Sequence, residues 1–126
     1  MRHPLRIFLL AVLMVASAVA QAMPVENKWR LQFSGAAESP GELVFEVTDS
    51  AGAAYRVHVA IEGNDGENRV AGKVRDAMKK ALKADYRLDR DDGEDVLVKR
   101  RVYQPRFSIV LVRSTVEDVR IGFDRE

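Results

Sequence analysis

The sequence predicts an α+β fold: a mostly antiparallel sheet of about seven strands with one amphipathic helix packed on one face, in the order βββαββββ. Three observations predict it. Apolar and polar residues alternate with a period of two over most of residues 26–126. One stretch, 64–84, changes to the period of a helix. Short runs of turn residues separate neighbouring strands, which favours antiparallel hairpins.

Three strands are expected before the helix, each with alternating apolar and polar residues: 28–34, 42–48 and 55–62. In the first of them Trp29, Leu31 and Phe33 share one face. The tetrapeptide Asp49–Gly52 consists of turn-forming residues and predicts a hairpin between the second strand and the third.

The helix is expected over residues 64–84, where apolar residues recur at intervals of three and four. Val74 and Met78 belong to this apolar stripe, so we expect both side chains to face the sheet. Asn64 is followed three positions later by Glu67, which resembles a capping box with Asn64 as the N-cap.

Four strands are expected after the helix: 86–88, 96–98, 107–112 and 119–123. The pair Asp92-Gly93 predicts a hairpin between the first two of these strands. The segment Phe107–Val112 is apolar on both faces apart from Ser108, so we expect this strand to lie centrally in the sheet.

The first 22 residues have the three-part plan of a secretory signal peptide. Arg2 and Arg6 form a basic start, Ile7–Val15 is unbroken apolar sequence, and small residues in an A-x-A pattern end at Ala22. This apolar run is shorter than the roughly 20 residues that span a bilayer, which disfavours a membrane anchor. We therefore expect cleavage after Ala22, a periplasmic or secreted location, and one mature domain over 23–126.

Charge and composition exclude several functions. The chain has 20 Lys and Arg, 19 Asp and Glu, and no cysteine, so a disulfide framework, a thiolate metal site and a cysteine nucleophile are excluded. Removal of Arg2 and Arg6 with the leader leaves 18 basic against 19 acidic residues, a net charge of −1. An exported chain of that charge is not expected to bind nucleic acid.

Catalysis is not expected, and neither is a cofactor. His58, the one histidine after residue 22, lies on the polar side of a strand, and no G-x-S-x-G or H-E-x-x-H motif accompanies it. A surface role for His58 is therefore favoured over a catalytic or metal-binding role. A small hydrolase using a pair of the 19 carboxylates stays an alternative, although no pair stands out.

The acidic stretch Asp89–Asp95 suggests either a calcium loop or an Asp-Gly hairpin. Counted from Asp89 as an EF-hand, Gly93 falls at position five and Arg100 at position twelve, where a glutamate is required. The hairpin is therefore favoured, and no metal site is expected.

Two groups of basic residues predict a surface for an anionic partner, such as lipopolysaccharide, an acidic glycan or an acidic protein. One group lies on an outward side of the helix and the other flanks an aromatic residue after it. The alternative is a solvated helix face together with charged strand ends that discourage edge pairing. The candidate binding residues are Arg69, Lys73, Lys80, Lys83, Lys99, Arg100, Arg101, Tyr103 and Arg106.

The segment Gly41–Val112 resembles a recurrent module of phage-tail and flagellar cap or hook-associated proteins. In that module two strands, here 43–47 and 55–59, precede a helix of the form seen at 70–77, and further strands follow. The resemblance implies the fold alone, and no functional residue is carried over from it.

A well-patterned core without a catalytic motif favours a small exported protein that works by binding. A second hypothesis is an inhibitor or immunity protein for an enzyme that attacks the cell envelope. In that case the Asp89–Asp95 tip would enter a basic active site, because a rigid hairpin binds a cleft with little loss of conformational entropy.

Overall fold

A computed structural model describes residues 24–126, and the expected signal peptide and its cleavage point lie outside the described residues. The α+β class and the order βββαββββ are confirmed. The elements are β1 (Lys28–Ser34), β2 (Gly41–Asp49), β3 (Ala54–Ile61), α2 (Glu67–Leu82), the 3-10 turn η1 (Lys83–Asp85), β4 (Tyr86–Asp91), β5 (Asp95–Arg100), β6 (Phe107–Ser114) and β7 (Arg120–Arg125).

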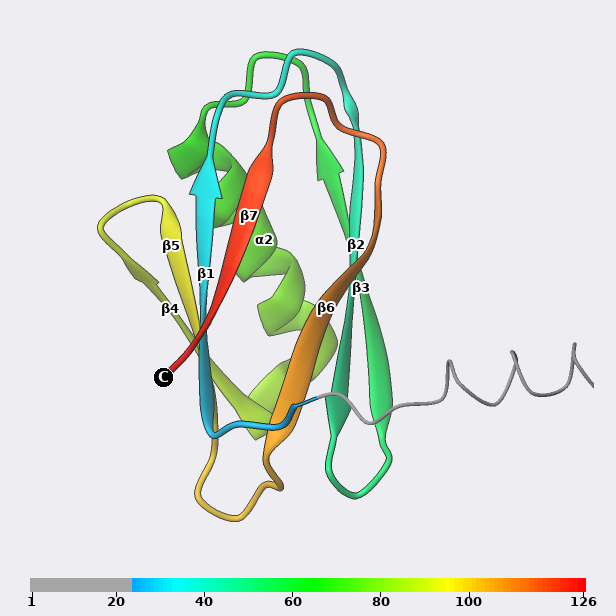
Figure 1. Ribbon diagram of the computed structural model, residues 1–126, viewed down its shortest axis with the longest axis vertical. Coiled ribbons are helices and arrows are strands. Elements are labelled where there is room, and N and C mark those ends of the chain that lie inside the picture. The colour runs from blue at the N-terminus through cyan, green and yellow to red at the C-terminus, as the bar shows by residue number, and fades with distance from the viewer. Residues whose placement is uncertain (1–23) are drawn as a thin grey trace, which may run out of the picture.

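The seven strands lie in two antiparallel sheets, with the orders β4-β5-β1-β7 and β3-β2-β6. In Figure 1 the helix α2 lies behind the strands. It contacts β3 of the smaller sheet and β4, β5 and β1 of the larger sheet. The core is therefore enclosed by the inner faces of both sheets and by the helix.

The apolar stripe of α2 fills this core. Val74 and Met78 are completely buried, which confirms that they face the strands, and Val70 is buried beside them. A stripe of this kind stabilises a helix mainly through tertiary packing, because a 16-residue helix is marginal in isolation.

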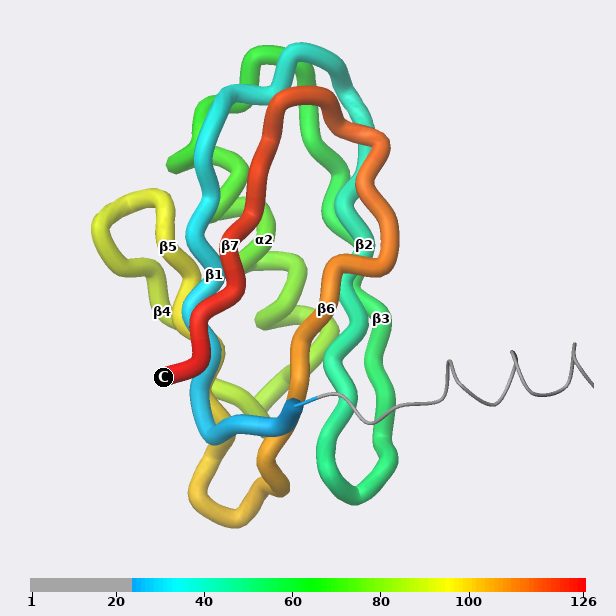
Figure 2. Tube along the Cα trace, viewed as in Figure 1, coloured from blue at the N-terminus to red at the C-terminus, as the bar shows by residue number. Residues whose placement is uncertain are grey.

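The two sheets are joined at one end by backbone contacts. Glu26, just before β1, forms an isolated antiparallel bridge with Phe107, the first residue of β6, through bonds of 2.8 and 2.9 Å. Figure 2 shows the chain entering β1 beside the base of β6. The indole nitrogen of Trp29 also donates to the Phe107 carbonyl at 2.9 Å. This buried hydrogen bond links β1 of the larger sheet to β6 of the smaller sheet.

The start of the helix differs from the predicted capping box. The N-cap is Gly66, no side chain caps the helix, and Asn64 lies in a left-handed turn with φ +70°. The carboxylate of Asp65 accepts the Glu62 backbone N–H at 3.0 Å and so orders the turn before the helix. The predicted capping box is wrong. An N-cap residue has an extended backbone, as Gly66 has, whereas Asn64 lies two positions earlier and has a positive φ.

The strand β6 was expected in the centre of a sheet, and this was wrong: it is an edge strand. Phe45 pairs with Leu111 and Val44 with Arg113, so Val112 is the extra residue of a β-bulge. The bulge interrupts the alternation of inward and outward side chains. That interruption, together with a 40% exposed Val112, explains why the run is apolar on both faces without being central.

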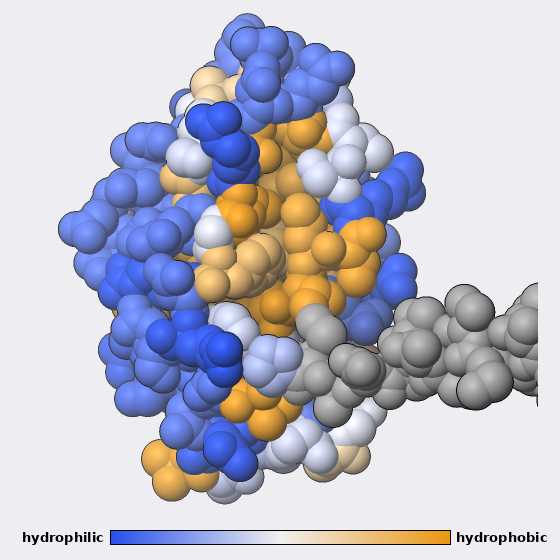
Figure 3. Space-filling model, in the orientation of Figure 1, coloured by the Kyte–Doolittle hydropathy of each residue, from blue (hydrophilic) through white to orange (hydrophobic). Residues whose placement is uncertain are grey.

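An apolar face lies over the region between β6 and β7, as Figure 3 shows. Leu111, Ile121 and Phe123 are partly buried there and pack against the core. The rings of Phe45 and Phe123 meet edge to face, with centroids 6.4 Å apart. These residues close the interior, and because all of them are apolar they specify no partner chemistry.

Candidate functional site

A basic surface surrounds the end of α2, the start of β4 and the end of β5. Two open hollows of about 430 and 170 Å³ adjoin there, since both are lined by Arg87 and Arg101. The cations that line the hollows, which define the basic surface from here on, are Lys79, Lys83, Arg87, Lys99, Arg100 and Arg101.

The strand register places three cations in one row on the outer face of the larger sheet. Lys99 of β5 lies directly opposite Lys28 of β1 on one side and Arg87 of β4 on the other. Like charges at directly opposite cross-strand positions destabilise a sheet. An anion bound over this row would relieve the repulsion, so the row favours anion binding.

Little of this charge is neutralised by the chain itself. Asp89 is the acidic residue of the two linings, and its carboxylate accepts from Arg87 Nε at 3.1 Å. Within residues 24–126, no carboxylate lies within ion-pair distance of Lys79, Lys83 or Lys99. The basic surface thus presents three unpaired ammonium groups to solvent.

Arg100 has a structural task within this surface. Its Nη1 donates to the carbonyls of Val102 at 2.9 Å and Gln104 at 2.7 Å, and its Nε donates to Asn27 Oδ1 at 2.6 Å. These hydrogen bonds hold the backbone of residues 102–104 against the Arg100 guanidinium. The predicted binding residue Arg100 therefore shapes the loop between β5 and β6.

Arg101 ties the same loop to the end of the helix. Its backbone N–H donates to the Asp85 carbonyl at 3.2 Å, and its Nε donates to the Ala84 carbonyl at 3.1 Å. Beyond this anchor Val102 and Tyr103 are 93% and 80% exposed. The loop therefore presents two bulky side chains next to the basic surface.

Two of the predicted binding residues are instead used to hold the start of the helix. Lys73 Nζ lies 2.5 Å from a carboxylate oxygen of Asp65, and Arg69 Nε lies 3.9 Å from the other oxygen. Burial would raise the pKa of Asp65, but the hydrogen bonds from Lys73 and from the Glu62 backbone outweigh it and lower that pKa. Lys73 is thus paired with Asp65 and with Glu62 at 3.7 Å, and Arg69 has Asp65 as a more distant anionic neighbour.

Lys80 and Arg106 line neither hollow of the basic surface. Lys80 lines a groove between α2 and β3. Arg106 is exposed just before β6, where its carbonyl accepts the Ser50 backbone N–H at 2.8 Å. The structure therefore gathers Lys83, Lys99, Arg100 and Arg101, with Tyr103 on the adjoining loop, out of the nine predicted residues.

The groove between α2 and β3, of about 680 Å³, contains His58. Its charged lining is balanced, with Lys73 and Lys80 facing Glu62 and Asp76. His58 Nδ1 lies 3.4 Å from Glu42 Oε2, as a histidine oriented by a carboxylate would. No serine, threonine or cysteine is among the described residues that line the groove, so the groove offers this pair no hydroxyl or thiol side chain as a nucleophile.

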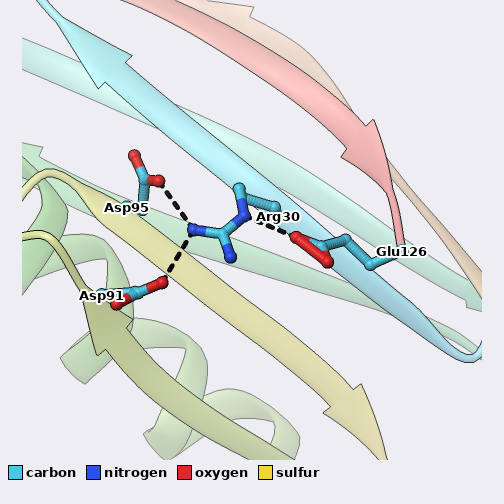
Figure 4. Close-up of polar contacts among 4 residues, drawn as sticks. All are labelled: Arg30, Asp91, Asp95 and Glu126. Atoms are coloured by element: carbon cyan, nitrogen blue, oxygen red, sulfur yellow. Dashed lines mark hydrogen bonds and ion pairs between the residues drawn. The ribbon is translucent and has the colours of Figure 1, made fainter.

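The acidic hairpin forms as predicted, and two of its carboxylates turn toward β1. Figure 4 shows Asp91 and Asp95 directed at Arg30 of β1, whose Nη1 lies 3.0 and 2.8 Å from them. No group of three or more acidic or histidine side chains suited to a metal ion occurs within residues 24–126. Asp91 and Asp95 bind Arg30, whereas Asp89 and Asp92 of the same stretch are exposed, so the acidic plug stays a prediction.

The predicted binding residues did not include Lys79 and Arg87 of the basic surface, nor Lys28, which completes the row beside Lys99. Alternation alone places Lys28 and Arg87 outward, because Trp29 and Leu88 beside them are apolar. Their proximity to Lys99 depends on the pairing of β1, β5 and β4, which no local pattern gives.

None of the helices found between residues 24 and 126 is both long enough and apolar enough to cross a membrane. No protein-family model and no curated protein matches the sequence. The resemblance of Gly41–Val112 to the phage-tail and flagellar module therefore stays a prediction.

Proposed function

We propose that the chain is a small exported binding protein, not an enzyme, that contacts an anionic partner through the basic surface. The partner is an anionic component of the bacterial envelope or an acidic protein. The observation that carries the proposal is the row of Arg87, Lys99 and Lys28 across three neighbouring strands.

The distribution of charge supports this surface more than the net charge does. Residues 23–126 carry 18 basic and 19 acidic side chains, so the chain as a whole does not attract anions. The acidic groups near Arg30 occupy the other end of the same sheet face, where Asp91 and Asp95 bind it. Separation of the two signs leaves a positive field over the basic surface, and such a field accelerates and orients encounter with an anion.

The proposal is tested by charge reversal at the centre of the row. The protein, expressed from its full sequence, is titrated with dextran sulfate as a soluble anionic probe at low and at raised salt. Lys99→Glu is expected to weaken binding by about tenfold or more, because it removes one cation and places an anion between two others. The salt dependence is expected to fall at the same time.

The matched control is Arg120→Glu, which reverses an exposed cation of β7 on the outer strand of the same sheet. It changes the net charge by the same amount and is expected to leave binding close to that of the wild type. Equal losses for the two variants would attribute binding to net charge and would overturn the proposed surface. Unchanged binding by Lys99→Glu would overturn it as well.

A further inference from the structure

The loop between β5 and β6 exposes two bulky side chains beside the basic surface. Val102 is 93% exposed and Tyr103 is 80% exposed. Val102 lines the same hollow as Arg87 and Lys99, so the apolar side chain and the cations belong to one continuous surface. We call Val102 and Tyr103 the apolar tip.

The apolar tip is held in place by polar contacts behind it. The Arg100 guanidinium binds the carbonyls on either side of Tyr103, and Gln104 closes a turn by donating its N–H to the Arg101 carbonyl at 2.9 Å. Arg101 fastens the loop to the end of α2. Because the loop is already ordered, a partner that buries the tip does not bear the entropy cost of ordering it.

We propose that the apolar tip enters the interface of a bilayer containing anionic phospholipids, while Lys79, Lys83 and Lys99 contact the phosphate groups. This inference rests on the proposed function, because it names the anionic partner of the same surface. Tyrosine is enriched at the level of lipid headgroups, where its ring is buried and its hydroxyl stays wet. Each cation near an anionic bilayer strengthens partitioning by about fivefold.

A lipid interface fits the tip better than an acidic protein does. The tip is almost fully exposed, and the neighbouring lining of the hollows consists largely of charged side chains. A protein partner would need a pocket shaped to this loop as well as carboxylates around it. A fluid headgroup layer supplies anionic groups and apolar depth together, without a matching shape.

The test measures flotation with vesicles of phosphatidylcholine alone and of phosphatidylcholine with phosphatidylglycerol, using the protein expressed from its full sequence. Binding is expected to the phosphatidylglycerol vesicles only. The double variant Val102→Ser with Tyr103→Ser is expected to weaken that binding by about tenfold or more, because it removes apolar area that the interface would bury. Its binding to dextran sulfate is expected to stay unchanged.

A second measurement places the loop directly. Tyr103→Trp introduces a fluorophore at the tip, and the native Trp29 is buried and serves as an internal reference. The emission is expected to move to shorter wavelength with phosphatidylglycerol vesicles and to stay unchanged with phosphatidylcholine vesicles. Circular dichroism of both tip variants is expected to match the wild type, since neither residue contributes to the core.

The outcomes separate this inference from the proposed function. Binding to dextran sulfate without binding to vesicles overturns the lipid proposal and leaves an acidic protein or glycan as the partner. Vesicle binding that the double serine variant retains overturns entry of the apolar tip and attributes the binding to the cations alone. Equal binding to both kinds of vesicle overturns the lipid proposal too. Failure of the wild type to bind any anionic probe overturns the proposed function itself.

Discussion

Arg30 Nε donates to the carboxylate of Glu126, which lies 96 positions later, at a distance of 2.5 Å. The same guanidinium binds Asp91 and Asp95, so one side chain of β1 joins the β4–β5 hairpin to the segment after β7 (Figure 4). A single cation of the central part of the larger sheet therefore contacts carboxylates on both of its flanks.

Arg30→Met is expected to destabilise the protein. Asp95 is 6% exposed and would lose its charged partner, which costs about 1–3 kcal/mol for a buried polar group. Urea unfolding at neutral pH measures the change. Arg125→Met is the control, because its contact with Glu26, at 3.5 Å, is open to solvent on the side of Arg125 and contributes little.

The pH dependence of the same contact has a defined sign. The hydrogen bond from Arg30 lowers the pKa of Glu126. A carboxyl group with a lowered folded pKa adds stability above its unfolded pKa, and that stability is lost as the pH falls through the folded pKa. The difference between Arg30→Met and the wild type is therefore expected to shrink in acid. If the difference in free energy of unfolding stayed constant as the pH fell below the usual pKa of a glutamate, the contact between Arg30 and Glu126 would not be its source.

Lys73→Met is expected to reduce stability without reducing anion binding. It removes the partner of Asp65, which is 4% exposed, and a charge buried without its partner is costly. We expect a loss of about 1–3 kcal/mol by urea unfolding, with dextran sulfate affinity unchanged. Lys80→Met, on the exposed side of the same helix, is the control. A selective loss of anion binding by Lys73→Met would return Lys73 to the binding surface.

Tyr86→Phe is expected to raise stability by up to about 1 kcal/mol, because the buried Tyr86 hydroxyl has no hydrogen-bond partner within the described residues. Its ring packs edge to face on Phe107 at 4.9 Å, a contact that phenylalanine keeps. Thermal or urea unfolding at pH 7 measures the gain. A clear loss would show that the hydroxyl is satisfied in solution.

The stability of Tyr86→Phe is also expected to differ from that of the wild type in its dependence on alkaline pH. Burial raises the pKa of Tyr86 from 10 to about 12. An elevated folded pKa adds stability below the unfolded pKa, and this contribution is lost as the pH rises from 10 toward 12. Tyr86→Phe is expected to lose less stability over that interval than the wild type, whereas the exposed Tyr103→Phe is expected to behave like the wild type.

Asp118→Asn is expected to raise the melting temperature at pH 7 by about 1–3 °C. A hydrogen bond with the Asp118 carboxyl, and then its charge, raises the pKa of Glu38. The contribution of protonated Glu38 to stability is present below its unfolded pKa and lost as the pH rises through the folded pKa, which leaves two repelling carboxylates at pH 7. Asparagine accepts the φ of +66° at position 118.

The control for this change is Asp92→Asn, because Asp92 is another exposed aspartate with positive φ, at +51°. It is expected to show no comparable gain. The benefit of Asp118→Asn is expected to vanish in acid, where Glu38 is protonated; a gain that persists there would attribute it to the backbone instead.

Features that depend on neighbouring residues in the chain could be predicted well from the sequence. Alternation located β1 to β3, and the helical stripe located Val74 and Met78 on the buried face. The hairpin at Asp92-Gly93 also follows from local backbone preference, since both residues have positive φ. These elements are set by the steric and hydrophobic preferences of a few consecutive residues.

Features that depend on distant residues could not be predicted. The bulge at Val112 is a property of the pairing between β6 and β2, so the apolar run was mistaken for a central strand. In the candidate site, Lys73 was selected for its charge, but its partner Asp65 comes from the turn before the helix. Lys28 was missed because only strand register brings it opposite Lys99.

The bulge in β6 has a consequence for aggregation. A straight, apolar edge strand is a template on which strands of other molecules assemble into fibrils. The extra residue Val112 bends this edge, and the charged Arg113 follows it immediately. Deleting Val112 alone would remove the bulge and make the pairing of β6 with β2 regular. The straightened edge of β6 could then pair with strands of other copies of the chain.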